Sequence, residues 1–244
     1  MDALSTASYG IDGCCAGWFY VREQAGQFIF GIVEKLADLL SNEPAQSVVF
    51  IDMPIGLRDA SATPRGCDVA ARKFLGRPRS SSVFAVPLRG VLDCDDYASA
   101  LAENRRLSGK GFSKQAFGII RKIREVDELL ANGTGSKVIV REIHPELCFW
   151  AFAGGHAMTH SKKTQAGFLE RLAVLQPSMP GASQIVTDAL RQYRRRDLSR
   201  DDIVDALAAL ATARQPLKRL STAPLVPEKD SRGLSMENVY CSFE

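Results

Sequence analysis

Residues 9–33 read YGIDGCCAGWFYVREQAGQFIFGIV, three short apolar runs separated by polar or glycine-containing turns. Their aromatic and β-branched residues predict three consecutive strands, at 9–12, 18–22 and 28–33. A short amphipathic helix is expected at 34–40, and residues 47–52, SVVFID, follow without polar alternation. A run of that kind is typical of a strand covered on both faces. This part of the chain therefore predicts a β-meander followed by a buried strand.

Further along the chain the patterns are mostly helical. Residues 57–136 begin with a segment rich in Arg, Ser, Gly and Pro and then turn helical, so we expect an inserted, partly irregular region there. The β-branched run 137–144 predicts another strand, and the tail after Pro216 is polar, with a last strand expected at 238–243. Helices are expected at 67–75, 95–107, 114–130, 146–152, 164–175, 184–195 and 200–214. With no internal repeat or clear linker, the simplest interpretation is one α/β domain over residues 1–244.

The composition is that of an ordinary globular protein. Of the 244 residues, 45% are hydrophobic, 24% charged and 8% aromatic, which excludes whole-chain disorder, collagen and coiled coil. No run approaches the roughly 18 apolar residues of a membrane span, and the N-terminus lacks the features of a secretory signal, so we expect a cytoplasmic protein with no membrane partner. The six cysteines show neither disulfide nor zinc spacing, and a net charge of +3 permits an anionic partner without requiring one.

Two aspartates stand where apolar strands give way to turns. Asp12 ends the run YGID and Asp52 ends VVFID, and the carboxyl ends of sheet strands are where α/β folds gather ligands. Burying an unpaired carboxylate is costly, so such a group is retained where it is hydrogen-bonded, paired or bound to a cation. Capping of the following turn is the alternative role for either residue alone.

A third aspartate lies in a segment that is otherwise apolar. Within residues 201–210, DDIVDALAAL, the stretch 203–210 is apolar around the whole helix and Asp205 is its only charged residue. The same helix carries small residues that let it lie close to the sheet, at Ala206, Ala208 and Ala209. Asp202, one turn earlier, is a further candidate, although acids in the first turn are also favoured by the helix dipole.

The strand expected at 137–144 supplies two more candidates in VREIHPE. Glu142 and His144 share one face by strand alternation, and Glu142 lies mid-strand beside apolar residues, where an acid is costly. Glu146 begins the following helix. Capping of that helix is the alternative role for Glu146, and a hydrogen bond to a backbone carbonyl is the alternative for His144.

Carboxylates that converge from separate segments repel one another, and a hard divalent cation removes the repulsion by taking their oxygens as ligands. Mg²⁺ or Mn²⁺ is the natural cofactor for such a set. Two ions about 4 Å apart can hold a phosphodiester, generate the attacking hydroxide and stabilise the leaving oxygen without a protein nucleophile. We therefore expect metal ligands at Asp12, Asp52 and Asp205, with Glu142 or Asp202 as a fourth carboxylate.

Five motifs, in order along nearly the whole chain, resemble those of the DUF429 family. They are GIDGCCAGW (10–18), FIDMPIGL (50–57), RGCDVAARKFLGRPRSSSVF (65–84), REIHPELCFW (141–150) and DDIVDALAAL (201–210). Members of the family are described as predicted nucleases with a ribonuclease H-like fold. The resemblance implies a mixed five-stranded sheet flanked by helices, with residues 57–136 inserted between strands four and five.

The resemblance also bears on the acids. The ribonuclease H-like superfamily places one acid on the first strand, one at the end of the fourth and one or more on the final helix. Asp12, Asp52 and Asp205 fall on those three places. The resemblance thus implies a metal-dependent nuclease, a hydrolase that acts on a nucleic acid or another phosphodiester. The long insertion is a departure, which either brings substrate-binding groups of its own or covers the site.

A basic cluster at the start of the insertion supplies candidate substrate contacts. It follows the strand of Asp52 directly and falls within one of the family motifs, and arginines beside hydroxyl groups suit phosphate. The best candidates for contact with substrate are Arg65, Arg77, Arg79 and Ser81, together with His144. A solvated charged face is the competing interpretation.

Two other classes of function fit the same residues. The sugar-kinase and actin group shares the core and begins with a similar strand aspartate, so a nucleotide-binding phosphotransferase is one alternative. With room for a single such core in 244 residues, it would need a dimer. The second alternative is a non-catalytic binding module that keeps the fold while its acids serve as caps and hydrogen-bond acceptors.

Overall fold

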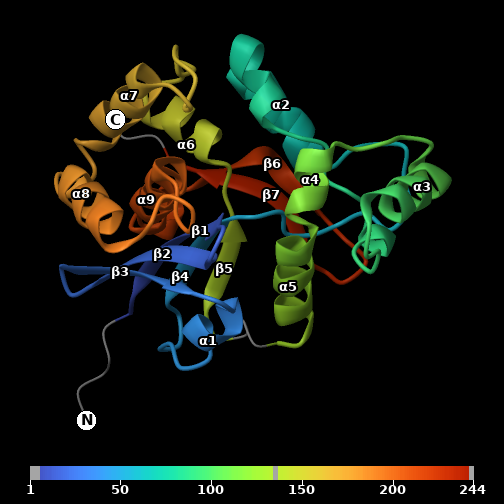
Figure 1. Ribbon diagram of the computed structural model, residues 1–244, viewed down its shortest axis with the longest axis horizontal. Helices are drawn as coiled ribbons and strands as arrows, with labels where there is room; N and C mark the ends of the chain where they lie inside the picture. The colour runs from blue at the N-terminus through green and yellow to red at the C-terminus, as the bar shows by residue number, and fades with distance from the viewer. Residues whose placement is uncertain (1–5, 134–136, 242–244) are drawn as a thin grey trace.

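The computed structural model describes residues 6–133 and 137–241, and a five-stranded mixed sheet lies at its centre (Figure 1). The strands are β1 (Ser8–Cys14), β2 (Gly17–Gln24), β3 (Gln27–Val33), β4 (Val48–Asp52) and β5 (Ile139–Glu142). They lie in the order β3-β2-β1-β4-β5, with β2 antiparallel to both of its neighbours and β1, β4 and β5 parallel. The mixed sheet expected from the sequence is confirmed.

Local sequence explains the hairpin and the buried strand. Strands β2 and β3 are joined by a two-residue turn in which Ala25 and Gly26 both have positive φ, 52° and 79°, the conformation that matches the twist of a hairpin. In β4, Val49 and Ile51 face one layer of the core and Phe50 faces the other. The run without polar alternation is therefore a strand with apolar cover on both faces.

Helices cover both faces of the sheet. One layer of helices consists of α6 (Pro145–Phe152), α7 (Gln165–Leu175), α8 (Ala182–Gln192) and α9 (Arg200–Ala213). The opposite layer contains α1 (Leu36–Leu40) and α5 (Ile120–Ala131). Each of these helices was expected from the sequence, although α8 begins and ends earlier than predicted. Within the part of the chain that the structure describes, no helix has both the length and the apolar character needed to cross a membrane.

Helix α9 lies directly against β1. All of its residues from Ile203 to Ala213 are buried. The approach is so close that a Cβ atom built on Gly10 would lie 2.0 Å from the backbone oxygen of Ala206 and 2.2 Å from the backbone nitrogen of Leu210. Only glycine fits at that point of β1, and the small residues of the helix allow the contact from the other side.

Between β4 and β5 the insertion is mostly helical. It contains α2 (Gly66–Arg79), α3 (Tyr97–Ser108), α4 (Lys114–Gly118) and then α5. Helix α2 is broken at Gly76, whose φ of 56° and ψ of −172° are not helical, so the helix predicted at 67–75 is followed by a separate turn. The single helix predicted at 114–130 is interrupted at Ile119, where φ is −106° and ψ is 6°, and forms two helices instead.

A C-terminal hairpin corrects the expectation of a polar tail after Pro216. Its strands are β6 (Ser221–Lys229) and β7 (Ser235–Tyr240), which pair antiparallel. Strand propensity does not predict β6, because the segment contains Pro224 and Pro227 and proline in a sheet is largely confined to edge strands. The strand predicted at 238–243 begins and ends earlier, as β7, and residues 242–243 lie outside the described residues.

Ion pairs tie this hairpin to the sheet and to the insertion. Arg141 of β5 donates to both carboxylate oxygens of Glu237, each at 2.8 Å. Arg89 of the insertion pairs with Asp230 in the turn of the hairpin, and Asp230 also accepts from the backbone N–H of Leu57 at 3.0 Å. The hairpin therefore closes the insertion against the sheet.

Replacing Gly10 with alanine is expected to destabilise the protein by roughly 3 kcal/mol, since the added methyl group overlaps the α9 backbone and forces the helix off the sheet. Gly181→Ala is the matched control, because no atom lies within 4 Å of a Cβ built there and its φ is −82°; its effect should stay within about 1 kcal/mol. Urea unfolding followed by circular dichroism measures both. Equal stability of G10A and the wild type would show that the fold does not depend on this contact.

Candidate functional site

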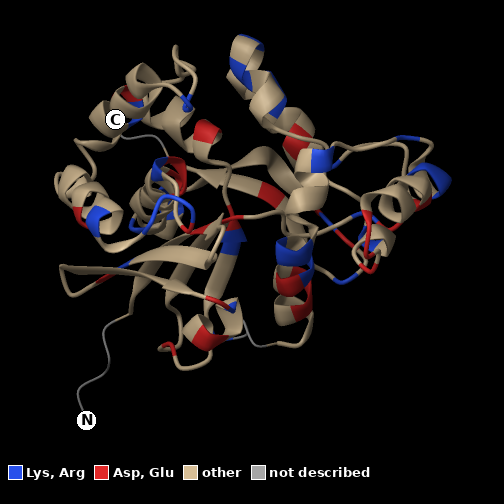
Figure 2. Ribbon diagram, viewed as in Figure 1, with Lys and Arg blue, Asp and Glu red and all other residues tan. Residues whose placement is uncertain are grey.

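Asp12, Asp52 and Asp205 meet at one edge of the sheet. Asp12 and Asp52 are paired residues in the parallel ladder of β1 and β4, and α9 packs across both strands. One carboxylate oxygen from each aspartate lies within 4.8 Å of the other two. Figure 2 shows acidic positions in the middle of the molecule, where the strand ends face α9. The structure thus brings together the three aspartates singled out from the sequence.

The three carboxylates share a site with little solvent. Asp12 is 8% exposed and Asp205 2% exposed. Burial and the neighbouring charges of Asp52 and Asp205 raise the pKa of Asp12 well above its usual range. Burial, followed by the charge of Asp205, raises the pKa of Asp52 to about 8. At neutral pH, therefore, the group retains protons unless a further cation joins it.

Lys162 is a cation of this site that was not among the predicted residues. Its Nζ donates to Asp205 Oδ2 at 2.6 Å, and its side chain is 37% exposed. The charge of Asp205, against the opposing effect of burial, raises the pKa of Lys162, so the ammonium form persists. In the sequence the residue stands in SKKT, a polar segment between α6 and α7 with no apolar background to make it conspicuous.

The loop that carries Lys162 is held from two helices. Arg79 of α2 donates from Nε to the carbonyl oxygen of Met158 and from Nη2 to that of Thr159, both at 2.7 Å. Glu170 of α7 accepts from the backbone N–H of Thr159, also at 2.7 Å. Arg79, predicted to contact phosphate, is thus engaged with backbone carbonyls and positions the loop.

Asp202 lines the same cleft but serves as a helix cap. Its Oδ2 accepts from the backbone N–H of Ser199 at 2.9 Å, and Ser199 Oγ accepts from the N–H of Asp202 at 3.3 Å, which forms a capping box at the start of α9. Burial raises the pKa of Asp202. Its carboxylate is not one of the three whose oxygens converge. Asp202 therefore stabilises the first turn of α9, the alternative considered from the sequence, and its role as a metal ligand stays a prediction.

Glu142 and Arg65 bind each other. Both carboxylate oxygens of Glu142 accept from Arg65, at 2.7 and 2.8 Å, and Oε2 also accepts from the N–H of Ile55 at 2.6 Å. Arg65 is 4% exposed and pairs with Asp68 as well, at 2.7 Å. Burial, opposed by Arg65, raises the pKa of Glu142 to about 7. The guanidinium of Arg65 therefore points inward and holds β5 to the turn after β4, which is a correction to its predicted contact with substrate.

A second group of metal-type ligand atoms is found beside Glu142. Cys67, Asp68 and Glu142 each offer one atom within 4.8 Å of the others. Both carboxylates are already paired with Arg65, and burial raises the pKa of the Cys67 thiol. This group is an ion-pair cluster that supports the fold, so we do not assign it a metal.

Two polar atoms on the wall of the cleft have no hydrogen-bond partner within the described residues. They are Nδ1 of His144 and Oε2 of Glu146, both inaccessible to solvent. Burial, reinforced by the charge of Lys162, lowers the pKa of His144 to about 4, so its imidazole is neutral at pH 7. Glu146 uses its other oxygen to pair with Arg171. Unpaired buried polar atoms are costly, and their presence on the wall indicates a place for a bound group.

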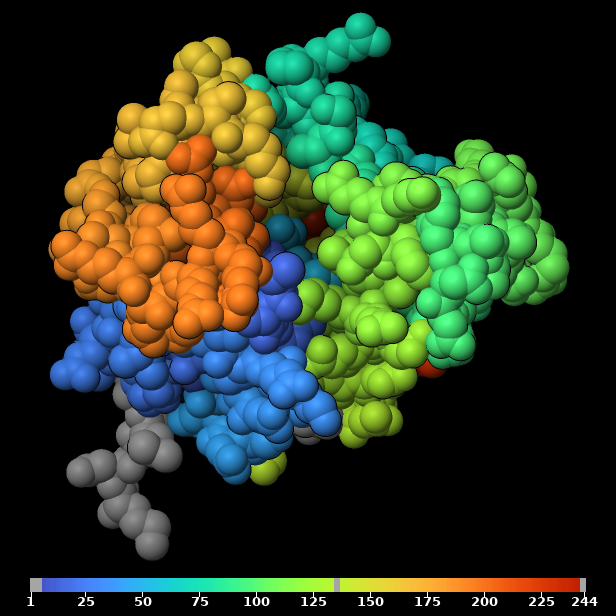
Figure 3. All heavy atoms as spheres, in the orientation of Figure 1, coloured from blue at the N-terminus to red at the C-terminus, as the bar shows by residue number. Residues whose placement is uncertain are grey.

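The cleft has a volume of about 330 Å³ and opens where Figure 3 shows the surface hollowed, between the side formed by α7 and α9 and the side formed by α4 and α5. Ser81 lines it, with Oγ donating to the carbonyl oxygen of Pro78 at 3.0 Å. Arg77 follows the break in α2, is exposed, and is not part of the lining. The remaining lining residues are Gly13, Met53, Pro54, Ser82, Phe84, Gln115, Ile119, Lys163 and Asp201.

Comparison with protein-family models gives a match over most of the chain. The family model DUF429, described as a protein of unknown function, matches residues 10–230. The matched region contains the three aspartates and Lys162. No curated protein and no solved structure gives a significant match.

Stability should depend on pH through Asp52. The folded chain keeps a proton on this carboxyl up to a pH of about 8, whereas an unfolded aspartate releases it near pH 4, so the folded state binds more protons between these values. In EDTA, the free energy of unfolding of the wild type is therefore expected to fall as the pH rises from about 4 to 8, and Asp52→Asn should remove part of that fall.

At pH 8.5, Asp52→Asn is expected to be more stable than the wild type by about 1 kcal/mol, or roughly 2–4 °C in Tm. Thermal melts in EDTA from pH 5 to 8.5 measure the effect. Asp95→Asn, at an exposed position outside the cleft, is the control and should leave the pH profile unchanged. A parallel loss of stability in wild type and D52N would contradict the raised pKa.

Removing the cation beside Asp205 should have the opposite effect. Lys162→Gln leaves a buried carboxylate unpaired, and we expect a loss of about 1–2 kcal/mol at pH 7 in EDTA, less than for a fully buried pair because Lys162 is partly exposed. Lys163→Gln is the control: Lys163 pairs with Asp201 at 2.7 Å but is 75% exposed, so its loss should stay near 0.5 kcal/mol. If urea unfolding shows equal losses of stability for the two variants, Lys162 contributes no more to stability than an exposed lysine.

Proposed function

We propose, from the premise that this chain belongs to the DUF429 family, that it is a divalent-metal-dependent phosphodiesterase of ribonuclease H-like type whose substrate is a nucleic acid. The observation that carries the proposal is the convergence of Asp12, Asp52 and Asp205 from two strand ends and one helix. Their oxygens approach within 4.8 Å in a cleft large enough to admit a sugar-phosphate segment. The order of the sheet strands and the final helix supports the same proposal.

The donor set fits a hard cation. All three converging ligands are carboxylates, and oxygen ligands of this kind suit Mg²⁺ or Mn²⁺ rather than a softer metal. Asp12, Asp52 and Asp205 would hold the ion. Glu146, whose Oε2 has no partner within the described residues, lines the same cleft and would offer a further carboxylate beside the ion. Bound there, a divalent ion supplies hydroxide at neutral pH and neutralises charge on the leaving oxygen.

Protonation of the acids determines the pH at which they could bind a metal ion. Asp52, with its pKa raised to about 8, has to release its proton before its oxygens can act as ligands. Lys162 keeps Asp205 paired in the meantime, at 2.6 Å. Uptake of a metal ion therefore releases protons and is favoured by alkaline pH, which is the reason for assaying the protein at pH 8.5.

Several cations beside the acids favour an anionic polymer as substrate. Lys162 lines the cleft, and Lys163 lines both the cleft and a second hollow next to it. Arg195 and Arg200 line that hollow as well. Because Lys162 and Lys163 are themselves paired with Asp205 and Asp201, phosphates on either side of a scissile bond would meet mainly the two arginines, and contacts to phosphate place a nucleic acid without reading its sequence.

The imidazole of His144 has a further part in the proposed site. It lines the cleft and stays neutral at pH 7, because burial and Lys162 lower its pKa to about 4. A neutral imidazole can donate one hydrogen bond and accept another, so it can orient a water molecule or a phosphate oxygen without adding charge. This role is compatible with its predicted contact to substrate.

Asp12→Asn is expected to abolish cleavage. Labelled single-stranded, duplex, hybrid and junction substrates are incubated with the protein and Mn²⁺ at pH 8.5; the wild type should cleave at least one, and D12N should lose about 100-fold or more of that rate, because one ligand to the metal is gone. Mn²⁺ should also raise the Tm of the wild type but not that of D12N. The control, Asp95→Asn, should match the wild type in both measurements.

Three outcomes would contradict the proposal. If no substrate is cleaved and Mn²⁺ leaves the Tm unchanged, the acids serve the fold and the protein is a binding module. If ATP binds in calorimetry and Mn²⁺ gives no cleavage, the phosphotransferase alternative is favoured. Cleavage that is the same in D12N and the wild type would point to a contaminating nuclease.

A further inference from the structure

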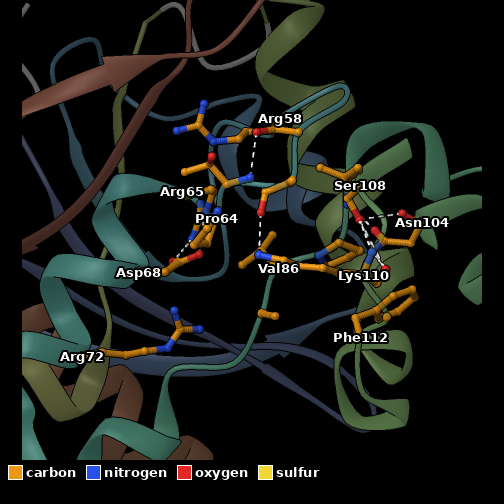
Figure 4. Close-up of a pocket in the computed structure, with 17 residues that line it drawn as sticks. Arg58, Pro64, Arg65, Asp68, Arg72, Val86, Asn104, Ser108, Lys110 and Phe112 are labelled. Carbon is orange, nitrogen blue, oxygen red and sulfur yellow. Dashed lines mark hydrogen bonds and ion pairs between the residues drawn. The ribbon is translucent and has the colours of Figure 1, made fainter. Parts of the chain in front are cut away.

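A second cavity lies within the insertion, away from the acidic cleft. It has a volume of about 220 Å³ and lies between the loop after β4, helix α2, residues 85–88 and the end of α3 (Figure 4). It shares no lining residue with the cleft of the three aspartates. A ligand in this cavity would therefore contact none of the residues that line the acidic cleft.

The charges on its wall are unbalanced. Four basic residues line it, Arg58, Arg65, Arg72 and Lys110, against a single acid, Asp68. Two of the four are neutralised: Arg65 by Asp68 and Glu142, and Arg58 by Glu228 at 2.5 Å.

The other two basic residues have no ion pair within the described residues. Arg72 donates from Nε to the carbonyl oxygen of Val83 at 3.0 Å, and Lys110 donates from Nζ to the carbonyl oxygen of Ala62 at 2.6 Å. In Figure 4 the Arg72 side chain extends toward the pocket from α2, and Lys110 lies on the opposite side. The donors left over on both groups give the pocket an excess of positive charge for an anion to neutralise.

Part of the remaining wall is apolar, and it is held in place. Val86, Leu88 and Phe112 line the pocket, and Leu88 and Phe112 are both 7% exposed. Asn104, itself buried, accepts from the N–H of Leu88 at 3.1 Å and donates to the carbonyl oxygen of Lys110 at 2.8 Å. One side chain thus fixes the two segments that carry the apolar wall and the lysine, so the pocket is preorganised.

We propose that this pocket binds a small organic anion, a phosphate or carboxylate carried on a compact apolar body. Arg72 and Lys110 would neutralise the anionic group while Val86, Leu88 and Phe112 contact the body. Sites for drug-sized ligands have volumes of roughly 300–1,000 Å³, so a pocket of about 220 Å³ takes a smaller ligand.

Isothermal titration calorimetry of the full-length protein in EDTA tests the proposal with phenyl phosphate and benzoate, and with inorganic phosphate and benzyl alcohol as the separate halves. One of the two aromatic anions should bind with a stoichiometry of one, at least tenfold more tightly than either half. Arg72→Gln and Lys110→Gln should each weaken that binding about tenfold. Lys73→Gln, at the exposed neighbouring position of α2 outside the lining, is the matched control and should bind as the wild type does.

Other results would overturn it. Absence of binding by both anions, or equal binding by inorganic phosphate alone, denies a pocket for an organic anion. Binding that is lost in Lys162→Gln and kept in R72Q and K110Q places the ligand in the acidic cleft instead. Circular dichroism of R72Q and K110Q shows whether each variant is folded, and the use of two variants keeps the test valid if one is not.

Discussion

The close packing of α9 on β1 is the constraint on which the site depends. The backbone of Gly10 meets the backbone of α9 with no side chain between them. Asp205 precedes Ala206 at that contact, so it is brought to the strand ends where Asp12 and Asp52 already lie side by side. A larger residue at position 10 would hold the helix away, and the three carboxylates would no longer converge. Packing at one glycine thus sets the spacing of the acids.

Several buried acids are each paired with a cation from a different segment of the chain. The pairs are Glu142 with Arg65, Glu146 with Arg171, and Asp205 with Lys162. The first two are almost free of solvent, whereas Lys162 reaches in from a loop. Within the described residues, Asp12 and Asp52 form no ion pair at all. Two of the three converging aspartates therefore lack the compensation that Glu142 and Glu146 have, which is why the aspartates, rather than those two glutamates, are proposed to hold a metal.

The aspartates could be predicted from the sequence because an acid in an apolar run is costly, and that contrast is visible without coordinates. Lys162 could not be predicted, since lysines in polar loops are common on protein surfaces. Its place in the site depends on Arg79, a residue of the insertion that holds the loop in position. The burial of Arg65 could not be predicted either, because it results from pairing with Glu142 on another strand. Without that pairing, an arginine in a basic segment is expected to contact substrate. The sheet was predictable from strand patterns, whereas β6 was not, because its prolines oppose the propensity for a strand.

Because Asp205 belongs to α9, the site draws on segments that lie far apart in the sequence. A polypeptide leaves the ribosome from its N-terminus, so β1 and β4 are synthesised long before residues 200–213. A growing chain that has not reached α9 has Asp12 and Asp52 without the helix that buries them and without their third companion. The three acids therefore converge only after α9 has been synthesised, and a truncated product that lacks α9 lacks the third carboxylate of this site.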